Sequence, residues 1–102
     1  MNKLFIDTSS REKIIIKINN KEFVLQTPEN KSQKLLSFII ESLKKEKLEL
    51  NNLTEIEVAT GPGSFTGLRV GVSVANTLGF SLNIPVNGLD IKAGEQVKIT
   101  YS

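Results

Sequence analysis

The chain has 102 residues, enough for one small domain with a single core and too few for two. Hydrophobic residues make up 39% and charged residues 24%, which is typical of a folded protein and unlike a disordered chain. The net charge of +2 is too small to indicate a nucleic-acid partner. The absence of cysteine and histidine excludes disulfides, thiolate nucleophiles and the commonest metal and acid–base sites.

Three strands are predicted near residues 3–7, 12–19 and 21–27, running antiparallel. The continuous apolar run Leu4–Ile6 favours a central strand that is buried on both faces. The second segment, KIIIKI, is rich in β-branched residues. The Asn19–Asn20 pair that follows it tolerates the positive φ of a tight hairpin turn.

A helix is predicted over residues 31–47. Asn30 and Gln33 have the spacing of an N-terminal capping box, and Pro28 ends the preceding extended segment. The lysines between Lys31 and Lys47 indicate a solvated face. The opposite face is apolar and contains Leu35, Leu36, Ile39, Ile40 and Leu43, with Phe38 at its margin.

A further strand, IEVAT, leads into the glycine-rich segment TGPGSFTGLRVG (residues 60–71), which begins a second helix expected from about Ser64 to Leu82. Residues 85–87 would add a short strand, and residues 95–101 either an edge strand or a tail. This order predicts an α/β fold, with a mixed five-stranded sheet covered by helices and a helical crossover that places the fourth strand parallel to its neighbour. The pattern is that of a ribonuclease H-like single domain.

The glycine-rich turn matches neither nucleotide fingerprint. Its spacing of Gly61, Gly63 and Gly67 is one residue too long for a dinucleotide site, and Arg69 stands where a Walker loop needs Ser or Thr, with no lysine before it. The helix N-terminus could still hold an anion. We favour a structural interpretation, in which the glycines supply unusual dihedral angles and Ser64 or Thr66 caps the helix, because such caps are common.

Two other features allow two interpretations each. Asp7, Thr8 and Ser9 follow the first strand and would suit a metal ion with phosphates, or only a strand-terminal turn that uses their local hydrogen bonds. On the second helix, small residues recur every four positions and predict a close backbone approach, either to the chain's own sheet or to a partner helix. These residues are Gly67, Gly71, Ala75 and Gly79.

The segments LFIDTSS and GPGSFTGLRVGVSVANTLGFSLNIPV, with NKSQKLLSFI between them, resemble the TsaB (YeaZ) family. The resemblance covers roughly residues 4–88. It implies an actin-like ATPase fold and a non-catalytic role beside TsaD, the similar catalytic subunit that modifies tRNA with threonylcarbamoyladenosine. Residues 1–88 are then expected to form the N-terminal-type domain, and residues 89–102 a divergent segment.

The resemblance implies that the chain has no catalytic residue, cofactor or metal. Asp7, Thr8 and Ser9 would then be a vestigial nucleotide site. The implied partners are a TsaD-type subunit, a TsaE-type ATPase in the same complex, and a second copy when the chain is alone; tRNA is contacted only indirectly. No membrane segment is expected, and a cytoplasmic location follows by default. The alternative is a nucleotide- or phosphate-binding enzyme that uses Asp7 and the Gly61–Gly67 turn. The apolar sectors of both helices predict a partner surface at Leu35, Ile39, Ser42, Val70, Val74 and Thr77.

Overall fold

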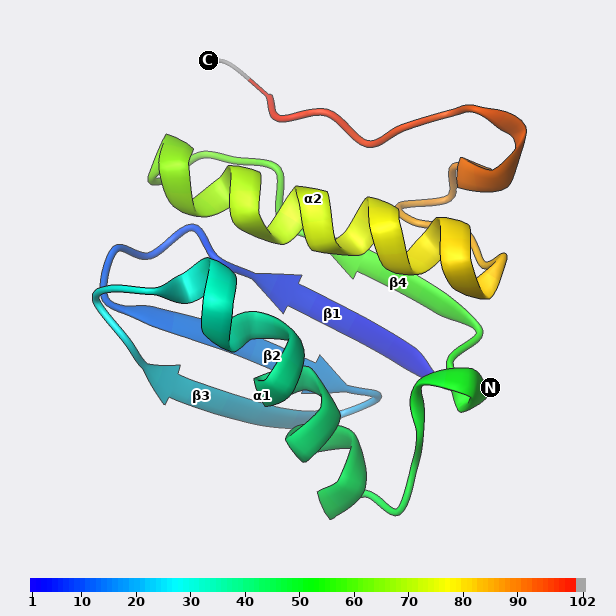
Figure 1. The fold of residues 1–102 in the computed structure, drawn as a ribbon, viewed down its shortest axis with the longest axis horizontal. Coiled ribbons are helices and arrows are strands. Elements are labelled where there is room, and N and C mark those ends of the chain that lie inside the picture. The colour runs from blue at the N-terminus through cyan, green and yellow to red at the C-terminus, as the bar shows by residue number, and fades with distance from the viewer. Residues whose placement is uncertain (101–102) are drawn as a thin grey trace.

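The computed structural model describes residues 1–100, which form a mixed sheet with two α-helices on one of its faces (Figure 1). The strands are β1 (Lys3–Asp7), β2 (Lys13–Ile18), β3 (Lys21–Gln26) and β4 (Glu55–Val58), in the order β3-β2-β1-β4. β1 to β3 are antiparallel, and β4 is parallel to β1, as predicted. The helical crossover before β4 therefore makes β1 a central strand.

The prediction that β1 is buried on both faces is wrong. Its residues alternate, with Leu4 and Ile6 fully buried and Phe5 only half-buried. The reason is that α1 (Lys31–Lys45) and α2 (Phe65–Leu82) cover the same face of the sheet. Within the described residues no helix covers the other face, where Val24 of β3 is 45% exposed.

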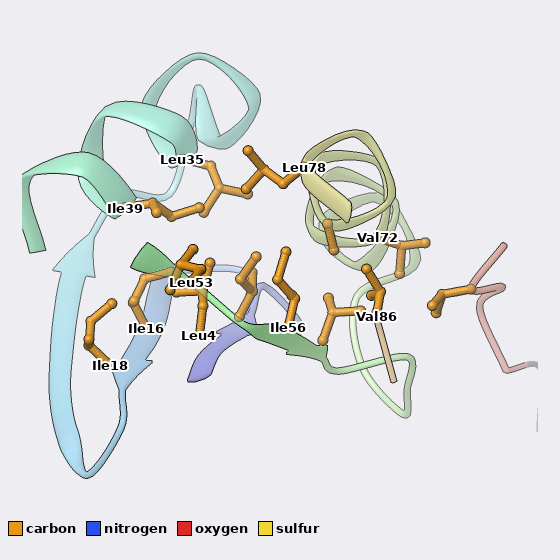
Figure 2. Close-up of a cluster of buried hydrophobic side chains, with 14 of the residues drawn as sticks. Leu4, Ile16, Ile18, Leu35, Ile39, Leu53, Ile56, Val72, Leu78 and Val86 are labelled. Atoms are coloured by element: carbon orange, nitrogen blue, oxygen red, sulfur yellow. The ribbon is translucent and has the colours of Figure 1, made fainter. Parts of the chain in front are cut away.

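The core lies between the sheet and the two helices (Figure 2). Alternate residues of the strands point up toward α1 and α2, whose apolar faces complete the layer. Fully or almost fully buried residues of this core include Leu4, Ile16, Ile18, Leu35, Ile39, Leu53, Ile56 and Val86. Burial of this continuous apolar layer is the main favourable term in folding.

The two helix N-termini differ from each other. At α2, the predicted cap is confirmed, since the Ser64 Oγ accepts a hydrogen bond from the Gly67 amide at 3.3 Å. At α1, the predicted capping box is wrong. Asn30 has left-handed backbone (φ 64°), and its side chain makes no cap hydrogen bond. Its carbonyl oxygen instead accepts hydrogen bonds from the amides of Gln33 and Lys34.

The sheet of the described residues has four strands, not the predicted five. Residues 85–87 run beside β4 for a single bridge, from Ile56 to Val86. Positive φ angles at Asn87 and Gly88 then turn the chain away before a strand can form. The Asn87 side chain takes over the pairing, because its amide oxygen and nitrogen bond to the backbone NH and CO of Val58 at 2.8 and 3.1 Å.

The C-terminal segment returns over α2 on the side away from α1 (Figure 1). After a short 3-10 turn at Ile91–Ala93, residues 95–100 are extended and pair with no strand. The remainder of the segment that was predicted as an edge strand or tail, Tyr101, lies outside the described residues. Val97 is only 6% exposed, so this segment contributes to the core.

The glycines of α2 allow the helix to approach its own sheet. A Cβ atom at Gly67 would lie 2.2 Å from the carbonyl oxygen of Thr8, and one at Gly71 would lie 2.5 Å from the Thr8 Oγ1. Farther along, a Cβ at Gly79 would lie 2.5 Å from the Val86 Cγ2. Of the two interpretations of the small-residue stripe, these contacts match packing within the chain.

We expect Gly67→Ala to destabilise the domain by about 1–3 kcal/mol. The helix gains about 1 kcal/mol of intrinsic propensity, but the new methyl group meets a backbone carbonyl that has little freedom to move. Urea unfolding followed by circular dichroism measures the change. Ser73→Ala, at an exposed position of the same helix, is the matched control and should change the free energy of unfolding by less than about 0.5 kcal/mol. Equal stability of both variants would contradict the close approach.

Candidate functional site

The end of β1 carries the residues that the sequence singled out for phosphate or metal chemistry, and their hydroxyl and backbone groups hold α2. Thr8 is fully buried, and its Oγ1 donates a 2.6 Å hydrogen bond to the carbonyl oxygen of Gly67. The carbonyl oxygen of Ser9 accepts a hydrogen bond from the Ser64 amide at 2.8 Å. These groups therefore fix the start of α2 against the sheet.

Asp7 forms a local turn of the kind that the structural interpretation required. Its Oδ1 accepts a 2.9 Å hydrogen bond from the Ser9 amide. Among the described residues, no cluster of three or more acidic, histidine or cysteine side chains is positioned to hold a metal ion. A single carboxylate with one of its oxygens already bonded is a poor site for Mg²⁺.

Lys31, which the sequence placed on a solvated helix face, is instead half-buried and lies close to this end of β1. Its Nζ donates a hydrogen bond to the carbonyl oxygen of Ser10. Partial burial lowers the pKa of the Lys31 ammonium from its ordinary value, while attraction to the negative charge of Asp7 raises it in part. A cation of the chain itself therefore neighbours the one carboxylate of the site. No local sequence pattern signals this contact, because it joins residues on different elements.

Beside this contact lies an open hollow of about 530 Å³, next to the N-termini of both helices. Its lining includes the basic side chains of Arg11 and Lys31 and the hydroxyl groups of Ser64 and Thr66. Basic groups and helix N-termini attract anions. Gly67 of the alternative phosphate-binding hypothesis lines this hollow, but Asp7, Gly61 and Gly63 do not.

The two glycines of the turn adopt backbone angles that side chains rarely allow, with φ of 141° at Gly61 and 150° at Gly63. A Cβ at Gly63 would lie 2.5 Å from the Cβ of Ser9, so the turn packs tightly on the segment after β1. At Gly61, a Cβ would lie 3.1 Å from the carbonyl oxygen of Thr100. The turn thus contacts both the end of β1 and the C-terminal segment.

The residues predicted to form the partner surface divide into two groups. Leu35, Ile39 and Ser42 are at most 1% exposed and face the core, where Ser42 Oγ donates to the Phe38 carbonyl oxygen at 2.8 Å. These three side chains offer no surface to a partner, because they are already buried within the chain. The proposed partner surface therefore omits them. On α2, Val70 and Val74 are half-buried and Thr77 is exposed.

An apolar residue that the prediction left out is available on α1. Leu36 is 43% exposed, and the neighbouring turn of α1 presents the half-buried Ile40. The sequence placed both on the apolar face of the helix but left them out of the partner surface, because an apolar residue at helical spacing does not reveal whether it faces a sheet or a partner. In residues 1–100, no helix is long and apolar enough to cross a membrane.

The protein is a small α/β domain in which the polar groups at the end of β1 form hydrogen bonds to α2 and to the turn before it. Comparison with known proteins identifies its class. The family model described as TsaD, tRNA N6-adenosine threonylcarbamoyltransferase, matches residues 26–92. The proteins named tRNA threonylcarbamoyladenosine biosynthesis protein TsaB are similar to this chain. The Bacillus subtilis protein is 34% identical over 97 residues, and that of Buchnera aphidicola from Schizaphis graminum is 32% identical over 90.

The chain therefore belongs to the family that the TsaD model describes, and it is similar to relatives named TsaB. The solved structure of YeaZ from Pseudomonas aeruginosa superimposes with a TM-score of 0.72 at 27% identity. The alignment covers 83% of this chain and 41% of that one. The two TsaB relatives are matched over 87% and 84% of this chain, which spans about two fifths of their length, 41% and 42%.

We expect Asp7→Asn to lower the pKa of Lys31 further. The substitution removes the negative charge that partly offsets the effect of burial on the ammonium group, and it keeps the size of the side chain. Titration of the lysine side chains by NMR measures the change. Asp90→Asn, at an exposed position far along the chain, is the control and should leave the Lys31 pKa unchanged. A pKa of Lys31 that does not respond to Asp7→Asn would contradict the proximity of the two charges.

Proposed function

We propose that this chain is a non-catalytic partner subunit that binds a TsaD-type threonylcarbamoyltransferase and supports threonylcarbamoyladenosine modification of tRNA. Its similarity to proteins named for that biosynthesis supports the pathway. The observation that carries the non-catalytic part is the use of Thr8 and Ser9 to hold α2. We further propose that the fold is ribonuclease H-like, of the actin-like ATPase superfamily, with residues 1–88 as the family-type domain and 89–102 as a divergent segment.

The chemistry at the end of β1 argues against nucleotide hydrolysis. Phosphate groups need free donors and space, but the Thr8 hydroxyl is buried in a hydrogen bond to α2 and Ser9 packs on Gly63. Among the described residues Asp7 belongs to no cluster of three or more metal-ligand side chains, and its charge also attracts Lys31. We therefore propose no catalytic residue, cofactor or metal ion for this chain.

Pairing would use the outer side of the two helices. Both lie on one face of the sheet and contact one another (Figure 1), and we propose that their solvent-facing sides together form the surface. Leu36 and Ile40 of α1 and Val70, Val74 and Thr77 of α2 contribute the partly exposed residues there. A similar subunit with the same helix pair could complete a helical bundle, and a second copy would occupy the same surface when the partner is absent. The two assemblies would then compete.

We also propose that a TsaE-type ATPase binds in the same complex. The second additional point is that this chain contacts tRNA only indirectly. The mixed charges of the chain support the second point, since 13 basic and 11 acidic residues give a net charge of only +2.

We expect Val74→Glu to weaken binding to a TsaD-type subunit by at least tenfold, because the interface would bury an unpaired charge. Thr77→Arg tests the same surface at an exposed position, where the substitution should not disturb folding. Val24→Glu is the matched control. It also places a charge at a partly exposed valine, but on the sheet face opposite the helices, and should bind as the wild type does.

Sedimentation of each variant, alone and with the TsaD-type protein, measures homodimer and heterodimer formation together. Competition predicts that Val74→Glu and Thr77→Arg weaken both. Wild-type affinity in both variants, with circular dichroism showing intact folding, would place the interface elsewhere.

The alternative of a phosphate-binding enzyme has its own test. We expect isothermal titration with ATP and Mg²⁺ to show no micromolar binding, and phosphate-release assays to show no turnover by the isolated chain. Micromolar binding that Asp7→Asn abolishes, together with turnover, would favour the enzyme that uses Asp7 and the Gly61–Gly67 turn.

A further inference from the structure

The C-terminal segment is held on α2 by a contact that imitates a β-strand. The carboxamide of Asn76 donates from Nδ2 to the Val97 carbonyl oxygen and accepts at Oδ1 from the Val97 amide, both at 3.1 Å. One side chain thus satisfies both peptide groups of one residue, as the opposite residue does in an antiparallel sheet. The contact recognises extended backbone whatever the side chain.

The side chain of Val97 makes an apolar contact at the same position, and this contact would select which residue can bind there. Val97 is 6% exposed and belongs to the core cluster together with Val72 and Ile91. Its neighbours Gln96 and Lys98 are exposed, and Ile99 is again half-buried. This alternation is that of an extended segment lying on a surface with one side toward it.

A second backbone contact fixes the far end of the segment. The Thr100 amide donates to the Thr60 carbonyl oxygen at 2.9 Å, and the hydroxyl groups of the two threonines are 3.3 Å apart. The absence of a side chain at Gly61 leaves room for this approach, since a Cβ there would lie 3.1 Å from the Thr100 carbonyl oxygen. The glycine-rich turn therefore also serves as part of a docking surface.

We propose that α2 and the turn at Thr60–Gly61 form a binding site for an extended peptide, and that residues 96–100 of this chain are its resident ligand. The site binds a segment with a β-branched apolar residue between two polar ones. Asn76 binds the backbone of that residue, and the apolar cluster that includes Val72 contacts its side chain. The segment lies beyond residue 92, where the family match ends. When residues 96–100 occupy the site, they cover the side of α2 that carries Asn76. The side with Val70 and Val74 then stays accessible to a partner.

Amide hydrogen exchange of the full chain tests how the segment is held. Asn76→Ala should speed exchange at Val97 and Thr100 by about tenfold or more, because both backbone contacts depend on docking. Amides of β1 and β2 should keep their protection, which shows that the domain is folded. Asn51→Ala is the matched control, since it removes the same carboxamide at an exposed position outside α2 and the C-terminal segment. Unchanged exchange in a folded Asn76→Ala variant would overturn the proposal.

A peptide added in trans tests whether the site binds a ligand as such. In full-length Val97→Asp, the resident segment should be released, and the blocked hexapeptide EQVKIT should shift the NMR signals of Asn76 and Thr60 in a saturable way. EQDKIT should not bind, and neither hexapeptide should bind Asn76→Ala/Val97→Asp. Failure of EQVKIT to bind the released variant, or equal binding to both variants, would overturn the proposal. The partner-binding assays above are independent of either result.

Discussion

The structure depends on one close approach, that of the first turns of α2 to the end of β1. Gly67 and Gly71 remove the side chains that would collide with Thr8, and the buried Thr8 hydroxyl then bonds to the Gly67 carbonyl oxygen. Because the approach is set by backbone atoms, it leaves the helix little freedom to shift. It fixes the turn before α2 as well, through the Ser64 amide and the Ser9 carbonyl oxygen. The position of α2 then determines which of its sides can meet another chain.

This approach also uses the polar groups at the end of β1 for hydrogen bonds within the chain. The polar residues there have the composition of a phosphate or metal site, but their groups are used within the chain. Thr8 is bonded to α2, the Asp7 carboxylate to the Ser9 amide, and the Lys31 ammonium lies close enough for Asp7 to affect its pKa. The hydrogen bonds of this cluster thus satisfy its polar groups and join the end of β1 to α2.

The sides of α2 are divided among three neighbours. Gly67 and Gly71 face the end of β1, and Gly79 faces the segment that follows the helix. The side around Leu78 meets α1, and the side at Asn76 carries the C-terminal segment. Figure 2 shows Leu35 of α1 and Leu78 of α2 pointing toward one another above the strands. Asparagine carboxamides bond to the backbone at two places. Asn76 of α2 bonds to Val97, and Asn87 bonds to Val58 of β4. In both, a side chain supplies the hydrogen bonds that a further strand would otherwise provide.

Local patterns in the sequence were sufficient to predict the strands β1 to β4, both helices, the Ser64 cap and the parallel crossover, because these depend on periodicity and on neighbouring residues. The sequence also carried the family resemblance in its glycine-rich segment. Tertiary structure alone decided which apolar helix residues are buried, so Leu35 and Ile39 belong to the core while Leu36 is exposed. It also placed Lys31 near Asp7, ended the expected fifth strand after one bridge, and laid Val97 on Asn76. These outcomes join residues that are distant in the chain, and no local pattern records the packing that brings them together.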